Sequence, residues 1–175
     1  MRICVFCGAA AGGDDAYAAQ AIALGHEIVA AGHGLVFGGG AVGLMGVVAD
    51  AVLQAGGEAI GVIPQQLVER ELAHRGLTDL RVVGSMHERK ALMADLAAAF
   101  VALPGGFGTL DELIEIITWR QLGLHKKPIG LLDAGGFWAP FTALVEHLRA
   151  AGFLRVDPGQ ILYDDDAARL LERLI

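Results

Sequence analysis

Two glycine-rich segments of this 175-residue chain have the composition of anion-binding loops. Residues 38–46 read GGGAVGLMG and residues 104–112 read PGGFGTLDE; each follows a short apolar run and leads into a helical pattern. Glycine lets backbone N–H groups approach a ligand closely because no Cβ intervenes. The start of a helix adds unpaired N–H groups and a positive dipole end. The two segments predict a phosphate cradle, although tight turning alone also favours glycine.

A carboxylate follows the second segment at a position suited to catalysis. Glu112 lies three residues after Thr109, so both are expected on one face of a helix over residues 109–122, with Thr109 as its cap. A carboxylate near a helix start is stabilised in its ionised form. Glu115, three residues further along the same face, is a weaker candidate.

Two cations stand at the beginning of another expected helix, over residues 86–98. Arg89 and Lys90 occupy its first turn, where positive charge opposes the helix dipole. A bound anion would explain this placement, whereas the alternative is that both side chains are simply solvated.

The elements that must position these residues alternate between strand and helix. Strands are expected at residues 2–7, 35–37, 59–63, 80–83, 100–103, 129–132 and 161–163. Helices are expected at residues 16–31, 43–55, 86–98, 109–122, 137–151 and 165–175, with a short helical piece at 69–74. This pattern predicts a single α/β domain over residues 1–175, a Rossmann-like, open, doubly wound parallel sheet with helices on both faces. Ligands bind such sheets at the carboxyl ends of the strands, where both glycine segments begin.

Composition excludes several classes of protein. The net charge of −7 and the lack of a basic run disfavour a nucleic-acid partner. No apolar run approaches the roughly 20 residues of a membrane span, and Gly8 interrupts the first apolar stretch too early for a signal peptide, so a cytoplasmic protein is expected. Cys4 and Cys7 have no second cysteine pair to complete a zinc site and are expected to be small buried residues; no metal is expected.

The sequence matches the known motifs of nucleotide-binding proteins poorly. Gly38, Gly40 and Gly43 spell GxGxxG, but the next expected strand ends in Ile63-Pro64, without the acid that holds the ribose in dinucleotide sites. This weakens the alternative of an NAD-dependent oxidoreductase. The GxxxxGK[ST] pattern of P-loop NTPases is missing from the sequence.

The chain resembles the LOG (Lonely Guy) family of cytokinin-activating nucleoside 5′-monophosphate phosphoribohydrolases. The resemblance rests on GGGxxGLMG at residues 38–46 and PGGxGTxxE at residues 104–112, and extends to residues 86–90 and 118–123. It implies a Rossmann-like fold, a homodimer or larger homo-oligomer, no cofactor, and cleavage of N6-substituted adenosine monophosphates and often AMP.

Carried over position by position, the resemblance makes Arg89 and Glu112 catalytic. Together with the glycine segments, it gives these expected nucleotide contacts: Gly38, Gly39, Gly40, Gly43, Glu71, Met86, Arg89, Lys90, Gly105, Gly106, Phe107, Gly108, Thr109, Leu110, Asp111, Glu112 and Thr118. The chain departs from the family at residues 8–10, which lack a common serine, at Ala98 in place of aspartate, and at Asp111 in place of glutamate.

Relatives have also been labelled lysine decarboxylases. The chain has three lysines, Lys90, Lys126 and Lys127, and none lies in an evident pyridoxal-phosphate constellation, which argues against that chemistry.

The expected reaction places Glu112 near the ribose ring, which gains positive charge as the N-glycosidic bond breaks, and Arg89 where it orients the nucleotide. Two alternatives remain besides the oxidoreductase. A non-catalytic carrier of a nucleotide or phosphorylated cofactor would need the glycines but not the Arg89–Glu112 pair. A protein-interaction scaffold would leave both glycine segments unexplained.

The helix expected at 109–122 also bears on assembly. Its apolar residues occupy more than one stripe: Leu113, Ile114, Ile116, Ile117, Trp119 and Leu122. A helix of this kind is expected to be buried on two sides, one against the sheet and one against a partner subunit.

Overall fold

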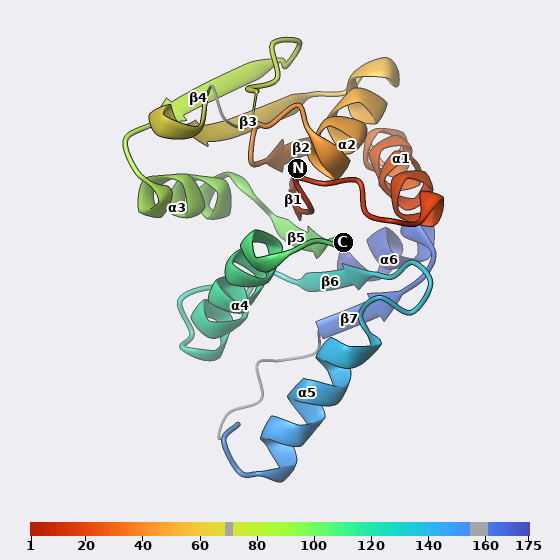
Figure 1. The fold of residues 1–175 in the computed structure, drawn as a ribbon, viewed down its shortest axis with the longest axis vertical. Coiled ribbons are helices and arrows are strands. Elements are labelled where there is room, and N and C mark those ends of the chain that lie inside the picture. The colour runs from red at the N-terminus through yellow and green to blue at the C-terminus, as the bar shows by residue number, and fades with distance from the viewer. Residues whose placement is uncertain (69–71, 155–160) are drawn as a thin grey trace.

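The computed structural model describes residues 1–68, 72–154 and 161–175, and within them seven strands form one sheet (Figure 1). The strands are β1 (Arg2–Phe6), β2 (Gly34–Phe37), β3 (Ala59–Pro64), β4 (Asp79–Val83), β5 (Ala99–Ala102), β6 (Ile129–Leu132) and β7 (Ile161–Asp164). They pair in the order β4-β3-β2-β1-β5-β6-β7, and every pair is parallel. The predicted open parallel sheet is confirmed.

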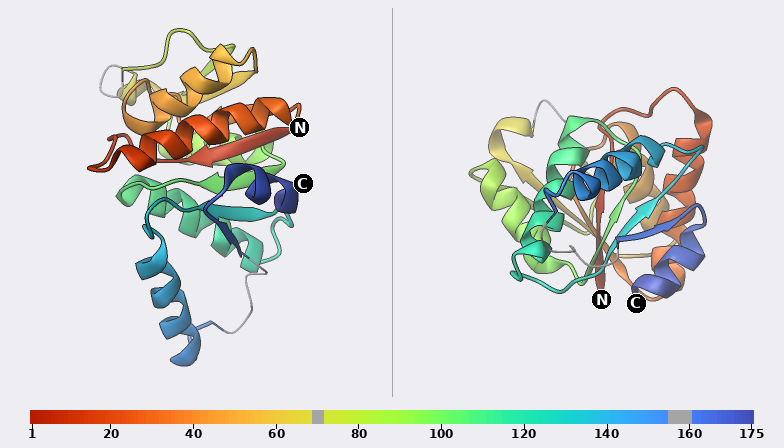
Figure 2. Two further views of the ribbon diagram at one scale, coloured as in Figure 1. Left: turned by 90° about the vertical axis from the view of Figure 1, so that its right-hand side faces the viewer. Right: turned by 90° about the horizontal axis from the view of Figure 1, so that it is seen from below.

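Helices cover both faces of this sheet (Figure 2). They are α1 (Asp15–Ala30), α2 (Gly43–Gln54), α3 (Met86–Leu96), α4 (Phe107–Gln121), α5 (Ala139–Ala150) and α6 (Ala167–Leu174). Alternate residues of β1 pack into two different hydrophobic cores, because successive side chains of a strand point to opposite faces of the sheet. Ile3 and Val5 pack with α1, α2 and α6, while Cys4 and Phe6 pack with α3 and α4. The doubly wound arrangement is therefore confirmed.

The strand order reverses beside β1, and this reversal positions the site. From β1 the chain moves outward through β2, β3 and β4, and then returns to β5 on the other side of β1. The loops that leave the carboxyl ends of β1 and β5 diverge to opposite sides, which opens a crevice between them. The Gly8 N–H donates to the Pro104 carbonyl oxygen at 3.1 Å and joins the two loops at the base of this crevice.

Two local predictions are wrong. The helical piece expected at 69–74 falls partly on residues 69–71, outside the described chain, and Ala73 forms an isolated bridge with Gly40 instead of a helical turn. A short 3₁₀ helix spans Gln65–Leu67. The cause is tertiary: the Ala41 N–H and the Gly39 carbonyl oxygen bond to the backbone of residues 72 and 74. The second correction is that α4 begins at Phe107 with Gly106 as its N-cap, so Thr109 is not the cap.

Two further features describe the outer parts of the molecule. Helix α5 projects away from the sheet, and none of its residues is buried (Figure 1). In the described ranges, no helix combines the length and apolar character needed to cross a bilayer.

Candidate active site

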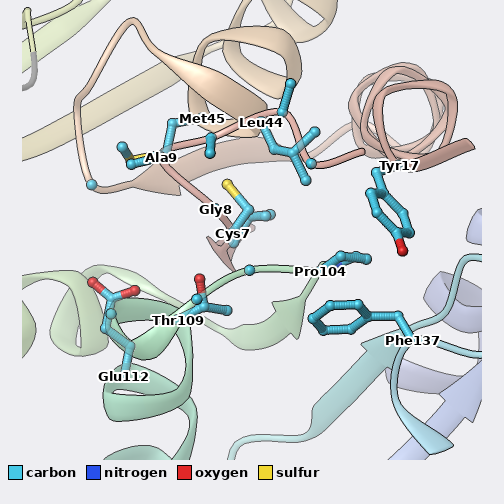
Figure 3. Close-up of a pocket in the computed structure, with 18 of the residues that line it drawn as sticks. Cys7, Gly8, Ala9, Tyr17, Leu44, Met45, Pro104, Thr109, Glu112 and Phe137 are labelled. Carbon is cyan, nitrogen blue, oxygen red and sulfur yellow. The ribbon is translucent and has the colours of Figure 1, made fainter. Parts of the chain in front are cut away.

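A cavity of about 540 Å³ occupies the crevice between the carboxyl ends of β1 and β5 (Figure 3). This volume falls within the usual range for small-molecule sites. Its walls come from the loops after β1, β2, β5 and β6 and from the first two turns of α1, α2, α3 and α4. Segments far apart in sequence therefore meet at the place where the topology predicts a ligand.

The second glycine segment opens directly onto this cavity. Gly105, Gly106 and Gly108 line it, and an added Cβ at Gly106 or Gly108 would meet no described atom within 4 Å. Among the described side chains none caps α4, and its first turn carries no acid. The first N–H groups of a helix have no intrahelical partners. The start of α4 is thus an accessible, positively polarised helix end, which suits a phosphate.

Thr109 adds a polar group whose bonding is incomplete. It is 3% exposed and lines the cavity, and no atom of the described chain hydrogen-bonds to its Oγ1. Figure 3 shows this hydroxyl on the cavity wall. A buried hydroxyl without a partner is destabilising, typically by about 1–3 kcal/mol. An oxygen-rich ligand at the start of α4 would satisfy it.

The first glycine segment behaves differently. Gly38 lines the cavity, but the positions of Gly39, Gly40 and Gly43 are not on its wall. Gly39 has a φ of +78° and lies against β3, Gly40 bridges to Ala73, and Gly43 has a φ of +58°. A Cβ on Gly43 would lie 2.3 Å from the backbone of residue 9. Most of this segment therefore packs against the rest of the protein, and it contributes Gly38, Leu44 and Met45 to the cavity wall.

Arg89 is fixed in the wall of the cavity by backbone carbonyls. It is only 5% exposed; its Nε donates to the Val62 oxygen at 3.1 Å and its Nη2 to the Gly38 oxygen at 2.7 Å. Its Nη1 lies 3.7 Å from the Met86 sulfur. A Cβ on Gly38 would fall 2.1 Å from Nη2, so glycine is required there to seat the guanidinium. This contact explains why Arg89 stands in the first turn of α3.

Glu112 lies on the same cavity, half-buried and one turn beyond the start of α4. Figure 3 shows its carboxylate projecting from the same helix as the Thr109 hydroxyl. The charges of both catalytic candidates act on the Cys7 thiol. Burial raises the pKa of Cys7, the negative charge of Glu112 raises it further, and the positive charge of Arg89 opposes the rise. The carboxylate and the guanidinium therefore act on the same small volume, and Cys7 stays protonated there. As predicted, Cys4 and Cys7 are free and buried.

Lys90 turns away from the cavity wall toward α4. Its Nζ lies 3.1 Å from Asp111 Oδ2 and 3.1 Å from Glu115 Oε2, and its side chain is 12% exposed. Burial opposes the ammonium charge, but the hydrogen bonds to both acids hold the pKa of Lys90 above its ordinary value. Asp111 and Glu115 are thus engaged outside the cavity. Of the described residues that line the cavity, Glu112 alone carries a carboxylate.

Other expected nucleotide contacts also lie off the cavity wall. Phe107 is 93% exposed, Leu110 packs against the core beneath α3 and α4, and Met86 touches the guanidinium described above. Thr118 is exposed and its hydroxyl donates to a backbone oxygen of its own helix at 2.8 Å. Glu71 lies outside the described residues.

Sequence reasoning missed the wall formed by the loop after β1 and by two aromatic rings. The lining residues that the sequence did not single out are Val5, Cys7, Ala11, Gly12, Tyr17 and Phe137, and the wall also includes Gly8, Ala9, Ala10, Leu44, Met45 and Pro104 from segments that it did. The rings of Tyr17 and Phe137 meet edge to face, with centroids 5.8 Å apart (Figure 3). The strand order would have revealed this wall, because ligands bind where that order reverses.

Phe137 is held in place by a turn after β6. One oxygen of Asp133 accepts from the Gly136 N–H at 2.8 Å and the other from the Trp138 N–H at 2.9 Å. Asp133 is 4% exposed, and these bonds bracket Phe137 on both sides. The aromatic end of the cavity is therefore rigidly built, and this turn also explains why α5 begins at Ala139, later than predicted.

An uncapped helix start lies at the topological switch point of this Rossmann-like α/β fold, beside a buried arginine and a carboxylate. This arrangement is typical of sites that bind anionic ligands. The family described as "Possible lysine decarboxylase" matches residues 45–174. The chain is 49% identical to the rice (Oryza sativa subsp. japonica) protein named cytokinin riboside 5′-monophosphate phosphoribohydrolase LOG, over 97% of this chain and 70% of that protein. It is 45% identical to the Arabidopsis thaliana phosphoribohydrolase LOG4, over 97% and 79% of the two chains. The chain belongs to this family, the LOG family that its motifs resemble.

Solved structures of molybdenum cofactor proteins share the fold. The carrier protein of Chlamydomonas reinhardtii superposes with a TM-score of 0.74 at 24% identity, covering 99% of this chain and 96% of that one. The molybdenum cofactor binding protein of Rippkaea orientalis gives the same TM-score at 20% identity, covering 98% and 93%. At these identities the likeness establishes the architecture alone.

Proposed function

We propose that this protein hydrolyses the N-glycosidic bond of adenosine 5′-monophosphates, with or without an N6 substituent, to the free base and ribose 5-phosphate. The observation that carries the proposal is the convergence of Arg89, Glu112 and the uncapped start of α4 on one cavity. The names of the relatives, which are phosphoribohydrolases of cytokinin riboside 5′-monophosphates, support the same reaction.

The 5′-phosphate would bind at the start of α4. The unpaired N–H groups and the Thr109 hydroxyl supply donors, and the glycines leave room for the phosphate oxygens. Binding of this remote group holds C1′ near Glu112, one helical turn further along α4. Binding energy from a part of the substrate that does not react is thereby used to orient the bond that breaks.

Cleavage moves the electron pair of the glycosidic bond onto the base and leaves positive charge on the ribose. The Glu112 carboxylate would stabilise this charge and accept a proton from the attacking water, whose oxygen then bonds to C1′. The leaving base takes up a proton from solvent water and becomes neutral, and Glu112 returns its proton to solvent, so that one water molecule is consumed overall. Arg89 stabilises negative charge and orients the nucleotide; because guanidinium remains protonated in proteins, it is a poor proton donor.

The carrier alternative is less well supported by the site. A protein that only holds an anionic cargo gains nothing from a carboxylate on the cavity wall, because like charges repel at short range. The retained Glu112 therefore favours catalysis.

The decisive test incubates the purified protein with AMP and with N6-isopentenyl-AMP and measures free base and ribose 5-phosphate. We expect release of both products, and far higher kcat/KM for AMP than for adenosine. Nucleotide binding without base release would favour the carrier. Equal kcat/KM for AMP and adenosine would contradict the phosphate site.

We also propose a homodimer or larger homo-oligomer, acting in the cytoplasm. On α4, Leu113 and Ile116 are buried, whereas Ile114 is 47% exposed, and Leu122, which caps the end of the helix, is 68% exposed. This second apolar face supports an interface, since large exposed apolar patches mark association sites. One chain has a mass of 18.3 kDa, and light scattering at micromolar concentration is expected to give at least twice this value. The Ile114→Lys variant is expected to have a lower mass, closer to that of the monomer.

A further inference from the structure

The two helices that carry the proposed catalytic pair are joined by one partly buried cation, Lys90. Arg89 and Lys90 are adjacent on α3, and Asp111 and Glu112 are adjacent on α4. Lys90 Nζ contacts Asp111 and also Glu115, each at 3.1 Å. The two helices lie on the same face of the sheet and share one apolar core. The bridge thus ties the neighbour of Arg89 to the neighbour of Glu112.

We infer that Lys90 is a positioning residue for the reaction: its bridge to Asp111 and Glu115 fixes α4 against α3 and so sets Glu112 relative to Arg89. This inference rests on the proposed function. It differs from the expectation that Lys90 touches the nucleotide, because the cavity wall does not include Lys90.

The Lys90 end of the bridge is better protected from water than an ordinary surface pair. Exposed ion pairs contribute little because water screens them and the side chains lose entropy. The Lys90 side chain is 12% exposed and that of Glu115 is 26% exposed, whereas Asp111 is 59% exposed, so the Lys90–Glu115 pair is the less screened of the two. These hydrogen bonds keep the lysine charged against the cost of burial, as the raised pKa of Lys90 indicates.

The two acids depend on the lysine in return. Asp111 and Glu115 are four residues apart on α4, so they face each other on one side of the helix. Like charges at this spacing repel. Removing Lys90 would leave two neighbouring carboxylates uncompensated and would disturb the first turns of α4, where Glu112 lies. A displacement of about 1 Å at a reacting group can reduce the rate about 100-fold.

The experiment compares the lysine with its two partners. Lys90→Met removes the bridge and leaves both carboxylates, while the double variant Asp111→Asn, Glu115→Gln removes both charges that it holds. If Lys90 acts through α4, both variants lower kcat for AMP by about 10-fold or more, whereas the Kd of ribose 5-phosphate changes less than about threefold. Lys90→Arg retains most of the activity because the cation is kept.

Two matched controls separate the bridge from general loss of charge. Lys126→Met removes an exposed lysine, and Asp95→Asn removes an exposed acid from α3 itself. Both are expected to retain wild-type kcat. A double acid variant with wild-type kcat would overturn the inference. So would a Lys90→Met variant that loses ribose 5-phosphate affinity when the double variant does not, because that pattern indicates direct contact with the phosphate.

A second measurement does not depend on catalysis. Amide hydrogen exchange over residues 107–112 is expected to be faster in Lys90→Met and in the double variant than in the wild type and both controls. Unchanged exchange overturns the positioning role whether or not the wild type is active. If the wild type releases no base but exchange responds as expected, the proposed function fails and the helix-fixing role of Lys90 stands.

Discussion

The two glycine segments have similar sequences and opposite surroundings. In residues 38–46, an added Cβ would collide with Arg89 at Gly38 and with backbone at Gly43 and Gly46. In residues 104–112, Gly106 and Gly108 face open space, and only Gly105 is crowded. The first segment therefore uses glycine to bring protein parts together, and the second uses it mainly to leave room for a ligand.

The difference shows that a glycine-rich sequence does not by itself identify an anion-binding loop. A glycine-rich loop before a helix is a general indication of anion binding, but the start of α2 already has a partner: the Leu44 N–H donates to the Gly8 oxygen at 3.0 Å. Neither helix has a side-chain cap in the described structure, but no backbone bond of this kind is found for the first N–H groups of α4 among the described residues. Anion binding depends on which N–H groups remain unpaired, and glycine content does not reveal this.

The largest effect is expected in the open segment, at the carboxylate that follows it. Glu112→Gln keeps the shape of the side chain and removes its charge, so kcat for AMP should fall about 100-fold or more, as for the loss of one preorganised electrostatic group. KM should change much less, and the melting temperature should remain within a few degrees of wild type. Glu146→Gln, on the exposed helix α5, is the control and should leave kcat for AMP unchanged. Near-wild-type kcat in Glu112→Gln would show that this carboxylate is not catalytic.

The next effect tests whether the packed segment serves the chemistry indirectly. Gly38→Ala places a methyl 2.1 Å from the present position of Arg89 Nη2, and the flexible end of that side chain must move. We expect kcat/KM to fall about 10- to 100-fold, since a misplaced charged group loses orientation, while the fold is retained. Circular dichroism and steady-state kinetics would measure both. Gly34→Ala is the control: its methyl would crowd the end of Glu58, remote from the cavity, and activity should persist. Full activity in Gly38→Ala would disprove the seating role.

The third effect falls on stability rather than on rate. Gly43 combines a φ of +58° with a Cβ position 2.3 Å from the backbone of Ala9, which cannot rotate aside. Gly43→Ala should lower the free energy of unfolding by about 2 kcal/mol or more, through backbone strain and overpacking. Urea unfolding would measure it. Gly56→Ala has a similar φ of +79° in open space, so it isolates the strain and should cost less. Equal losses in the two variants would show that the close packing of Gly43 contributes nothing.

Much of this architecture could be predicted from the sequence because it depends on local patterns. The apolar run at β6 was bounded correctly at Ile129–Leu132, and the starts of α2 and α3 at Gly43 and Met86 were also correct. These element bounds need only periodicity and punctuation by glycine. Arg89 and Glu112 line one cavity, at the sheet edge where parallel strands present their carboxyl ends, and their role as a pair is what the family resemblance implies.

The missed features depend on contacts that sequence does not display. Thr109 has the chemistry of a helix cap, but the chain already turns at Gly106, which places Thr109 inside the helix with its hydroxyl beside Gly105. Phe137 reaches the cavity because Asp133 fixes the turn around it, a long-range consequence of where β6 lies in the sheet. The sequence predicts that Lys90 contacts an anion, but it does not show that Lys90 Nζ lies 3.1 Å from Asp111 Oδ2.

The smallest effect is expected at Gly108, in the second glycine segment. Gly108 lies in the first turn of α4, lines the cavity, and would carry a Cβ into space free of described atoms. Gly108→Ala should therefore leave the fold intact, and the higher helix propensity of alanine should leave stability unchanged or raise it by up to about 1 kcal/mol.

The added methyl of Gly108→Ala would instead occupy space proposed for the phosphate, so KM for AMP should rise several-fold while kcat changes little, the pattern expected when binding is weakened equally in the ground and transition states. Gly13→Ala is the matched control, because its Cβ also meets no described atom and it lies off the cavity wall. Thermal unfolding and AMP kinetics on both variants decide the matter. A Gly108→Ala variant that unfolds like Gly43→Ala would show that the second segment is packed after all, and one with wild-type KM would place the phosphate elsewhere.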